Sequence, residues 1–399
     1  MKKTLLIALL IFLQFINVNA LELNSKYAVL YNLAEDKPVL EVNKDEITSV
    51  ASLTKIMTVY TAIKNIKDFN EKVILKNSMF AGLKEENAYV VGLKNNQSVT
   101  YNDLLYATLL ASGADATRAL VISISGSEEE FVKLMNNEVK KLNLINTHFT
   151  NAIGLDDETH YSTVDDIAKI LKEAYQNEKF KEIFKTENYK LSSGNITVKN
   201  SMKNASSHYN LDVKNIIGAK TGYTGNAGRC LASIAYDKEN DIEYLLVTTN
   251  AKTIKEPIID AINIYNEIFK TYKNQVLIEK NSLLVKIPTK YSNNKYISFY
   301  LKEDLTKYLK NDYDKNNVKV IYNGEKLITP KMSKNKKLGT VKIYYNNELI
   351  KKENIVLKEK IEFSLKEFLF VNKEIIVSFI MSFILIFLAV IFILKKLKK

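Results

Sequence analysis

The chain has 399 residues, of which 46% are hydrophobic, and a formal net charge of +12. Lys2 and Lys3 carry two of these charges and the four lysines that end the chain carry four. The remaining six are spread over residues 21–394 without a basic-aromatic motif, which argues against a nucleic-acid partner. The single cysteine, Cys230, excludes an internal disulfide, and three histidines without metal-ligand spacing disfavour a zinc peptidase, so no metal or cofactor is expected.

The first residues have the order of an export signal. Two lysines follow Met1, an apolar stretch covers residues 4–16, and a polar segment ends at Ala20, a small residue of the kind found at cleavage sites. The sequence therefore predicts a removable signal peptide over residues 1–20 and export of the chain that follows.

Residues 21–275 are predicted to form the larger domain, and their pattern changes from strand to helix and back. Two β-like runs, 27–31 and 38–42, predict a hairpin. Thr100 begins a capping-box variant that predicts the start of a helix over 104–111. The other periodic runs predict helices over 52–64, 128–142 and 164–175, strands over 230–235 and 243–248, and a closing helix over 258–272. This order indicates an α+β fold with helices inserted into a mainly antiparallel sheet.

Residues 276–368 have a different sequence pattern, typical of short strands. Short alternating runs at 283–287, 318–322 and 341–345 are separated by turn residues. This pattern predicts a small β-sandwich domain between the larger domain and the C-terminal segment.

Residues 375–394 form an uninterrupted apolar stretch with only Ser378 and Ser382 as polar residues. As a helix this stretch would be about 30 Å long, which matches the hydrocarbon core of a bilayer. The lysines in the tail at 395–399 favour the cytoplasmic side. The sequence therefore predicts a single-pass cell-membrane protein with its folded domains on the extracytoplasmic side.

The first group of residues able to carry chemistry is Ser52-Leu53-Thr54-Lys55. A serine at the first turn of a helix and a lysine three residues later lie on one face, so the amine can reach the hydroxyl. Burial or a second cation would depress the lysine pKa and make Lys55 a base for a Ser52 nucleophile. The same spacing begins at Ser292 and Ser333, but both lie among predicted turns of the β region.

A second group, Lys220-Thr221-Gly222, stands immediately before a β-like run. A glycine at a strand end lets a substrate backbone approach, while the lysine and threonine offer a cation and a hydroxyl to a carboxylate. Between the two groups, Ser112 follows an apolar helix, where a loop serine could face the cleft and pass protons. Ser193 is a rival in the same interval, but its neighbours predict a hairpin turn.

The serine–lysine tetrad, the middle serine and Lys-Thr-Gly, in this order, resemble the motifs of β-lactamases and penicillin-binding proteins. The resemblance is closest to the D-alanyl-D-alanine carboxypeptidases of the low-molecular-weight penicillin-binding proteins. It extends over residues 25–273, through the segments 51–58, 104–106, 154–157, 160–163, 220–224 and 227–231. It implies a β-lactamase/transpeptidase-like domain, and the following β domain resembles the C-terminal module of that family.

The resemblance implies removal of the terminal D-alanine from peptidoglycan stem pentapeptides. Ser52 would attack the carbonyl between the two terminal D-alanines, Lys55 would accept its proton, and the backbone amides of Ser52 and Tyr223 would hold the oxyanion. Ser112 and Lys220 would relay the proton to the leaving amine. Water would then hydrolyse the acyl-enzyme, and β-lactams would acylate the same serine.

The resemblance also implies which residues bind substrate, namely Lys220, Thr221, Gly222, Tyr223 and Arg229. The free carboxylate would meet Lys220, Thr221 and Arg229. The expected partners are therefore the peptidoglycan stem peptide as substrate, β-lactams as inhibitors, and the membrane through the C-terminal helix.

One position departs from the family pattern. The middle motif usually ends in an asparagine whose amide bridges the base lysine and the substrate, and here this position is Ala114. Ala114 keeps open the alternative of a non-catalytic envelope protein that binds peptidoglycan. A β-lactamase-like hydrolase is a separate alternative, against which the sequence has no glutamate placed after the middle motif to activate a deacylating water. His160 is predicted to be a structural hydrogen-bonding residue near the cleft, and Cys230 to be buried.

Overall fold

The computed structural model describes residues 22–34 and 38–397. The chain forms two compact units, one that ends at Lys270 and one that begins at Thr271. The domain boundary predicted between residues 275 and 276 falls within the first strand after this division, β10 (Tyr272–Ile278). The signal peptide predicted over residues 1–20 lies outside the described residues.

The first unit is built on one antiparallel five-stranded sheet. Its strands are β1 (Tyr27–Asn32), β2 (Pro38–Val42), β7 (Ile216–Thr224), β8 (Gly228–Asp237) and β9 (Ile242–Ala251). They lie in the order β2-β1-β9-β8-β7, so the N-terminal hairpin joins the C-terminal strands through β1 and β9. The predicted hairpin and antiparallel sheet are confirmed. Strand β7, which carries Lys220-Thr221-Gly222, lies at the edge of the sheet.

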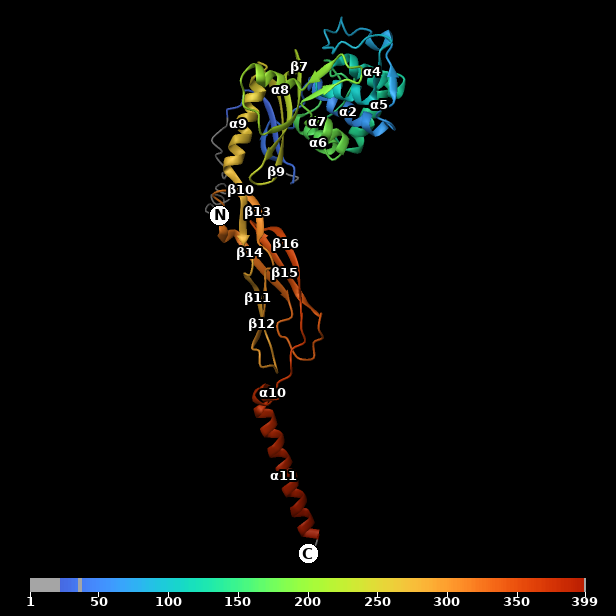
Figure 1. Cartoon of the computed structure of the whole chain (residues 1–399). Coiled ribbons are helices and arrows are strands. Elements are labelled where there is room, and N and C mark those ends of the chain that lie inside the picture. Colours follow the sequence, from blue (N-terminus) through green and yellow to red (C-terminus); the bar gives the residue numbers. More distant parts are fainter. Residues whose placement is uncertain (1–21, 35–37, 398–399) are drawn as a thin grey trace, which may run out of the picture. The chain divides into compact units, whose positions relative to one another are not determined.

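Helices cover both faces of this sheet (Figure 1). Ser233 of β8 faces α9 (Glu256–Thr271), where its Oγ lies 3.0 Å from the hydroxyl of Tyr265. The neighbouring Ala232 and Ile234 point to the opposite face and join the core of the inserted helices. These helices are α2 (Thr54–Asn65), α3 (Tyr101–Leu109), α4 (Ala114–Ser125), α5 (Glu128–Lys141), α6 (Val164–Ala174) and α7 (Glu178–Lys185), and a further helix, α8 (Ser201–His208), follows the second short hairpin. Helices α7 and α8 contact β7, and α6 contacts β1 and β9.

Two short hairpins complete the first unit. They are formed by β3 (Lys72–Ile74) with β4 (Ser98–Thr100) and by β5 (Asn188–Lys190) with β6 (Thr197–Lys199). The second hairpin encloses Ser193, which confirms the turn predicted there.

The helix α3 begins earlier and ends earlier than predicted. Thr100 and Asp103 form a reciprocal capping box, in which the Thr100 hydroxyl accepts from the Asp103 amide at 3.1 Å and the Asp103 carboxylate accepts from the Thr100 amide at 2.8 Å. A helix whose N-cap is residue 100 starts at residue 101, so the predicted start at 104 was wrong. The helix ends at Leu109, and the chain then turns through Ser112 in the left-handed region, at φ 63°.

The second unit contains three small antiparallel sheets around a separate apolar core. Strand β10 pairs with β13 (Leu305–Lys310), and β11 (Leu283–Pro288) pairs with β12 (Tyr296–Tyr300). The third sheet contains β14 (Val318–Gly324), β15 (Lys337–Tyr345) and β16 (Glu348–Val356). Ile287, Ile328 and Val341 are among the buried core residues. All three strands predicted in this region are therefore confirmed.

The chain continues into a short helix, α10 (Leu365–Val371), and a long one, α11 (Lys373–Leu397). Over Lys373–Lys396, α11 is long and apolar enough to cross a membrane. The predicted apolar helix over residues 375–394 is thus present, and its apolar window is not buried among the described residues.

Candidate active site

A tight turn places Ser52 beside Lys55. Ser52 lies in a 3-10 turn, η1 (Ala51–Leu53), that leads directly into α2. The Nζ of Lys55 lies 3.0 Å from Ser52 Oγ and donates to the carbonyl of Ile153 at 2.6 Å. Lys55 is only 1% exposed, and burial lowers its pKa to about 7, against the opposing effect of the Glu128 carboxylate. At neutral pH a large fraction of Lys55 is therefore the free amine, which can accept the proton of a hydroxyl.

A second buried lysine lies across the cleft on β7. The Nζ of Lys220 donates to Ser112 Oγ at 2.9 Å. Burial lowers the pKa of Lys220 well below its usual value, and the nearby Lys55 lowers it further. The structure thus brings all three predicted catalytic residues and Lys220 together as two serine–lysine pairs.

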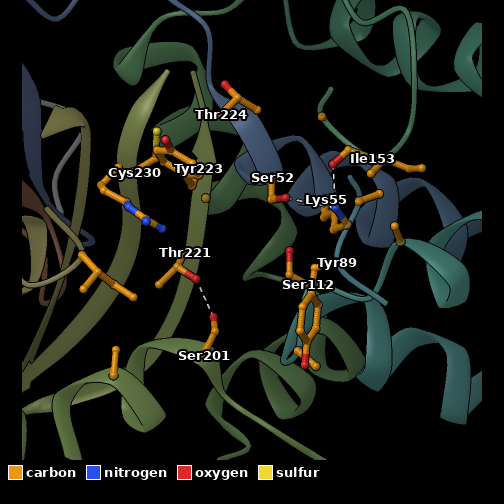
Figure 2. A pocket seen from close by; sticks show the side chains of 18 of the residues that line it. Ser52, Lys55, Tyr89, Ser112, Ile153, Ser201, Thr221, Tyr223, Thr224 and Cys230 are labelled. Atoms are coloured by element: carbon orange, nitrogen blue, oxygen red, sulfur yellow. Dashed lines mark hydrogen bonds between the residues drawn. The ribbon is translucent and has the colours of Figure 1, made fainter. Parts of the chain in front are cut away.

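The backbone of β7 lies directly against η1, the turn that holds Ser52 (the serine turn). A Cβ at Gly222 would lie 3.0 Å from the Ser52 amide nitrogen and 3.2 Å from the Ala51 Cβ. Only a glycine allows this approach without displacing the turn. Figure 2 shows Thr221 and Tyr223 on one side of the pocket and Ser112 on the other, with Ser52 between them.

The lower end of the site in Figure 2 holds a hydroxyl pair that the sequence analysis missed. The Oγ of Ser201, the first residue of α8, lies 2.5 Å from the Oγ1 of Thr221. The preceding Asn200 caps α8 and also donates to the carbonyl of Ala219 at 2.8 Å, which fixes α8 against β7. One sequence signal was available, since asparagine before a short helical run is a typical N-cap.

Arg229 lies opposite Tyr223 on the neighbouring strand. Its guanidinium carbon lies 3.8 Å from the centre of the Tyr223 ring, and its Nε is buried without a hydrogen-bond partner among the described residues. Stacking on the ring fixes the guanidinium plane while its nitrogens stay able to donate. The arrangement leaves a cation at the cleft wall ready to receive an anion.

These side chains surround one cleft with a volume of about 1230 Å³. This is larger than most sites for small ligands, which suits a peptide. Ser52, Lys55, Ser112 and Arg229 line the cleft, together with Thr221, Gly222 and Tyr223 of β7. Lys220 does not line it directly and reaches it through Ser112. Ser193 does not line it either; its Oγ accepts from Gln97 at 3.1 Å.

Ala114 lies in an apolar contact beside the cleft. It is buried in a small cluster with Leu83 and Ile153. Its amide donates to the carbonyl of Tyr89 at 2.7 Å. No amide side chain therefore comes from this position to Lys55, and the carbonyl of Ile153 takes one of the Lys55 hydrogens instead.

Replacing Gly154 by alanine is expected to destabilise the first unit by about 3 kcal/mol and to distort the site. Gly154 has φ 86°, and a Cβ there would lie 2.0 Å from the carbonyl oxygen of Ala51, next to Ser52. Both the backbone conformation and the contact with a main-chain atom oppose a side chain. Thermal unfolding of the full chain in detergent micelles measures the change.

The matched control for this substitution is Gly126→Ala. Gly126 has almost the same φ, 84°, but nothing lies within 4 Å of its added Cβ. We expect it to lose only about 1 kcal/mol, the difference in backbone preference. Equal losses at the two glycines would contradict the claim that Gly154 touches the serine turn.

His160 lies under the site and hydrogen-bonds as predicted. Its Nδ1 accepts from the Thr150 amide at 3.1 Å, so its Nε2 carries the hydrogen and donates to Thr54 Oγ1 at 2.9 Å. Burial lowers the pKa of His160 from 6.5 to about 4. A histidine in this state is neutral at physiological pH, which suits a structural role.

This depressed pKa predicts a loss of stability in acid. Above pH 6.5 His160 is neutral in both folded and unfolded chains, whereas between pH 6.5 and about 4 only the unfolded chain takes up the proton. The free energy of unfolding is therefore expected to fall by up to roughly 3 kcal/mol across this window. In urea titrations at several pH values, His160→Asn should remove that part of the pH dependence. The same substitution at the exposed His208 is the control, and an equal effect there would contradict the assignment.

Comparisons with known proteins agree along most of the chain. Residues 14–253 match the family model described as D-alanyl-D-alanine carboxypeptidase, and residues 272–362 match that of the penicillin-binding protein 5 C-terminal domain. The chain is 30% identical to the D-alanyl-D-alanine carboxypeptidase DacF of Bacillus subtilis over 342 residues, which cover 84% of this chain and 85% of that one. It is 27% identical to DacC of Escherichia coli over 364 residues, which cover 86% of each chain.

Solved structures show the same fold. Penicillin-binding protein 5 from Haemophilus influenzae superposes with a TM-score of 0.62 at 23% identity, over 85% of this chain and 98% of that one. The Streptomyces K15 DD-transpeptidase superposes with a TM-score of 0.56 at 26% identity, over 61% of this chain and 97% of that one.

The two family matches, together with the shared fold, place the chain among the penicillin-binding proteins of the DD-peptidase class. Within this class the chain belongs to the D-alanyl-D-alanine carboxypeptidase family, whose members are hydrolases. The resemblance and the fold class inferred from sequence are confirmed.

Proposed function

We propose that the protein removes the terminal D-alanine from peptidoglycan stem pentapeptides through an acyl-enzyme on Ser52. The observation that carries this proposal is the 3.0 Å contact between Ser52 Oγ and a buried amine whose pKa is lowered to about 7. This pair faces a cleft of peptide size at a strand edge that ends in glycine.

In the first step the free amine of Lys55 takes the proton of Ser52 as the Oγ bonds to the carbonyl carbon between the two D-alanines. The carbonyl π-electron pair moves to its oxygen. The amides of Ser52 and Tyr223 then donate to this oxyanion, and the close approach at Gly222 keeps the strand and the turn at the required separation.

In the second step the bond to the terminal D-alanine breaks, and its nitrogen keeps the electron pair and gains a proton. Ser112 is suited to deliver that proton because its hydroxyl is hydrogen-bonded to the buried Lys220. The proton that Lys55 took in the first step replaces the one delivered, so Lys55 is again a free amine. A water molecule then attacks the acyl-enzyme carbonyl while Lys55 takes its proton, the ester bond breaks, Ser52 Oγ takes that proton back, and the shortened peptide leaves.

The terminal carboxylate of the substrate would bind beside Thr221 and Arg229 on the cleft wall. Thr221 offers a hydroxyl there, paired with that of Ser201 at 2.5 Å, and Arg229 supplies positive charge, while Lys220 lies behind Ser112. A planar guanidinium with free donors binds a carboxylate in a fixed orientation. This part of the cleft wall therefore selects peptides with a free C-terminus.

We also propose that α11 anchors the protein as a single-pass membrane protein with both folded units outside the cytoplasm. The length and apolar character of Lys373–Lys396 support the anchor. The signal-like order of residues 1–20 and the lysines that follow the apolar stretch support the orientation.

The test is incubation of the full chain with a β-lactam, followed by mass spectrometry and by an assay of free D-alanine from a defined pentapeptide. A lasting adduct on Ser52 together with D-alanine release supports the proposal. Rapid turnover of the β-lactam would instead favour a β-lactamase. Absence of both adduct and release would favour a protein that only binds peptidoglycan.

A further inference from the structure

The Lys55 amine is hydrogen-bonded to the backbone carbonyl of Ile153 as well as to Ser52. A neutral amine has two hydrogens and one lone pair. The carbonyl of Ile153 accepts one hydrogen at 2.6 Å, while Ser52 Oγ lies 3.0 Å from the same nitrogen. With one hydrogen directed at Ile153, rotation of the amine is restricted and the lone pair can face Ser52.

A backbone carbonyl can hold an amine in place only if its own peptide is held. The Oδ1 of Asn151 accepts from three successive amides, those of Ile153 at 3.2 Å, Gly154 at 2.7 Å and Leu155 at 3.0 Å. Its Nδ2 donates back to the carbonyl of Leu155 at 3.2 Å. A single side chain thus closes the whole turn that presents the Ile153 carbonyl.

Glu128 fixes the same turn from the start of α5. Its Oε1 accepts from the Ala152 amide at 2.9 Å, and its Oε2 accepts from Arg118 at 3.1 Å. Arg118 is in turn paired with Glu86 at 2.7 Å. Glu128 is also the charged group that opposes the fall in the pKa of Lys55, while Lys55 itself lowers the pKa of Lys220.

Apolar packing also supports the 151–155 turn, and part of it comes from Ala114, the position that departs from the family pattern. Ala114 and Leu83 pack against Ile153 in one buried cluster. A small apolar side chain at 114 therefore holds the residue whose carbonyl contacts Lys55, where an asparagine would reach toward the lysine with its own amide.

We propose that Asn151, assisted by Glu128, is a positioning residue that aims Lys55 at Ser52 through the Ile153 carbonyl, in place of an amide at Ala114. This inference rests on the proposed function, because it assigns the support of the same base. Neither Asn151 nor Glu128 touches the reacting atoms; both act through the backbone of the 151–155 turn.

The test measures the acylation rate of the full chain by a fluorescent penicillin between pH 5 and 10, normalised to the number of sites that finally label. Asn151→Ala removes the acceptor of all three amide hydrogen bonds. It is expected to lower the acylation rate on the high-pH plateau by roughly 10- to 100-fold, because a misplaced Lys55 accepts the Ser52 proton poorly even when it is fully deprotonated. Asn151→Asp keeps the three acceptors and adds a negative charge. It should keep the plateau and move the acid limb to higher pH, because the carboxylate raises the pKa of Lys55.

The matched control is Asn177→Ala. The Oδ1 of Asn177 also accepts from successive amides, those of Lys179 at 2.9 Å and Phe180 at 3.1 Å, but it caps α7 and is not among the residues that line the cleft. This variant should lose stability and keep both plateau and acid limb. The inference is overturned if Asn151→Ala keeps the wild-type plateau, or if Asn151→Asp loses as much as Asn151→Ala. A wild-type chain that does not label at all would overturn the proposed function instead.

Discussion

Replacing Ser52 by alanine is expected to abolish both β-lactam labelling and D-alanine release, with a loss of roughly 10⁴-fold or more. The neighbouring serine and threonine hydroxyls of the described site are engaged with other partners than Lys55. Ser112 Oγ accepts from Lys220 at 2.9 Å, and the Thr221 and Ser201 hydroxyls are engaged with each other at 2.5 Å. Without the Ser52 hydroxyl, Lys55 can only activate water, which is not held in the geometry of the attacking oxygen. Chromatographic assay of D-alanine from a pentapeptide measures the loss.

The control for this substitution is Ser193→Ala, in the turn between β5 and β6. This serine was the rival in sequence, yet it is hydrogen-bonded to Gln97 and does not line the cleft. Wild-type release by Ser193→Ala is expected. Release by Ser52→Ala at the wild-type rate, with unchanged thermal unfolding, would refute the acyl-enzyme on Ser52.

Replacing Lys55 by methionine should separate stability from activity. The Lys55 amine is buried and its pKa is lowered to about 7, so burying its charged form destabilises the folded state. Methionine fills a similar volume without a polar group. The variant is expected to unfold at the same or a higher temperature than wild type. Its acylation rate should fall by about 10³-fold because the general base is gone. In the wild type the rate should rise as the pH passes through about 7, where Lys55 loses its proton.

Lys64→Met is the control on the same helix. Lys64 lies in the last turn of α2, and its ammonium pairs with Glu138 at 2.5 Å instead of entering the cleft. This change should leave the acylation rate and its pH profile as they are. A Lys55→Met variant that acylates at the wild-type rate would remove Lys55 from the proposed reaction.

Most of the residues of the candidate site could be predicted because their side chains have distinctive chemistry and a recognisable spacing. The spacing of Ser52 and Lys55 and the glycine after Lys220 and Thr221 are visible in the sequence, and the structure brings these residues together. The hairpin around Ser193 also followed from local turn chemistry. The capping box at Thr100 was recognised as well, although the helix start was placed three residues too late.

The parts that could not be predicted act through the backbone or over long sequence separations. A carbonyl such as that of Ile153 has no residue signature, since every residue has one. Asn151 and Glu128 are 23 positions apart in the sequence, and only the packing of α5 against the 151–155 turn makes them partners of the same peptide segment. Ser201 was missed because serine is common in helix N-terminal turns, and its pairing with Thr221 depends on how α8 lies against β7.

The two buried lysines have a further consequence for ligand binding. Burial lowers the pKa of both lysines, and the nearby Lys55 lowers the pKa of Lys220 further, so at neutral pH Lys55 and Lys220 are not both charged in the empty cleft. A carboxylate that binds beside Thr221 and Arg229 places a negative charge near these lysines and favours their charged state. Binding of the carboxylate is therefore expected to be coupled to uptake of a proton from solution by one of the lysines. Calorimetric titrations in buffers of different ionisation heat would then differ by an amount that reports this uptake, and affinity for carboxylate ligands would weaken as the solution becomes more alkaline.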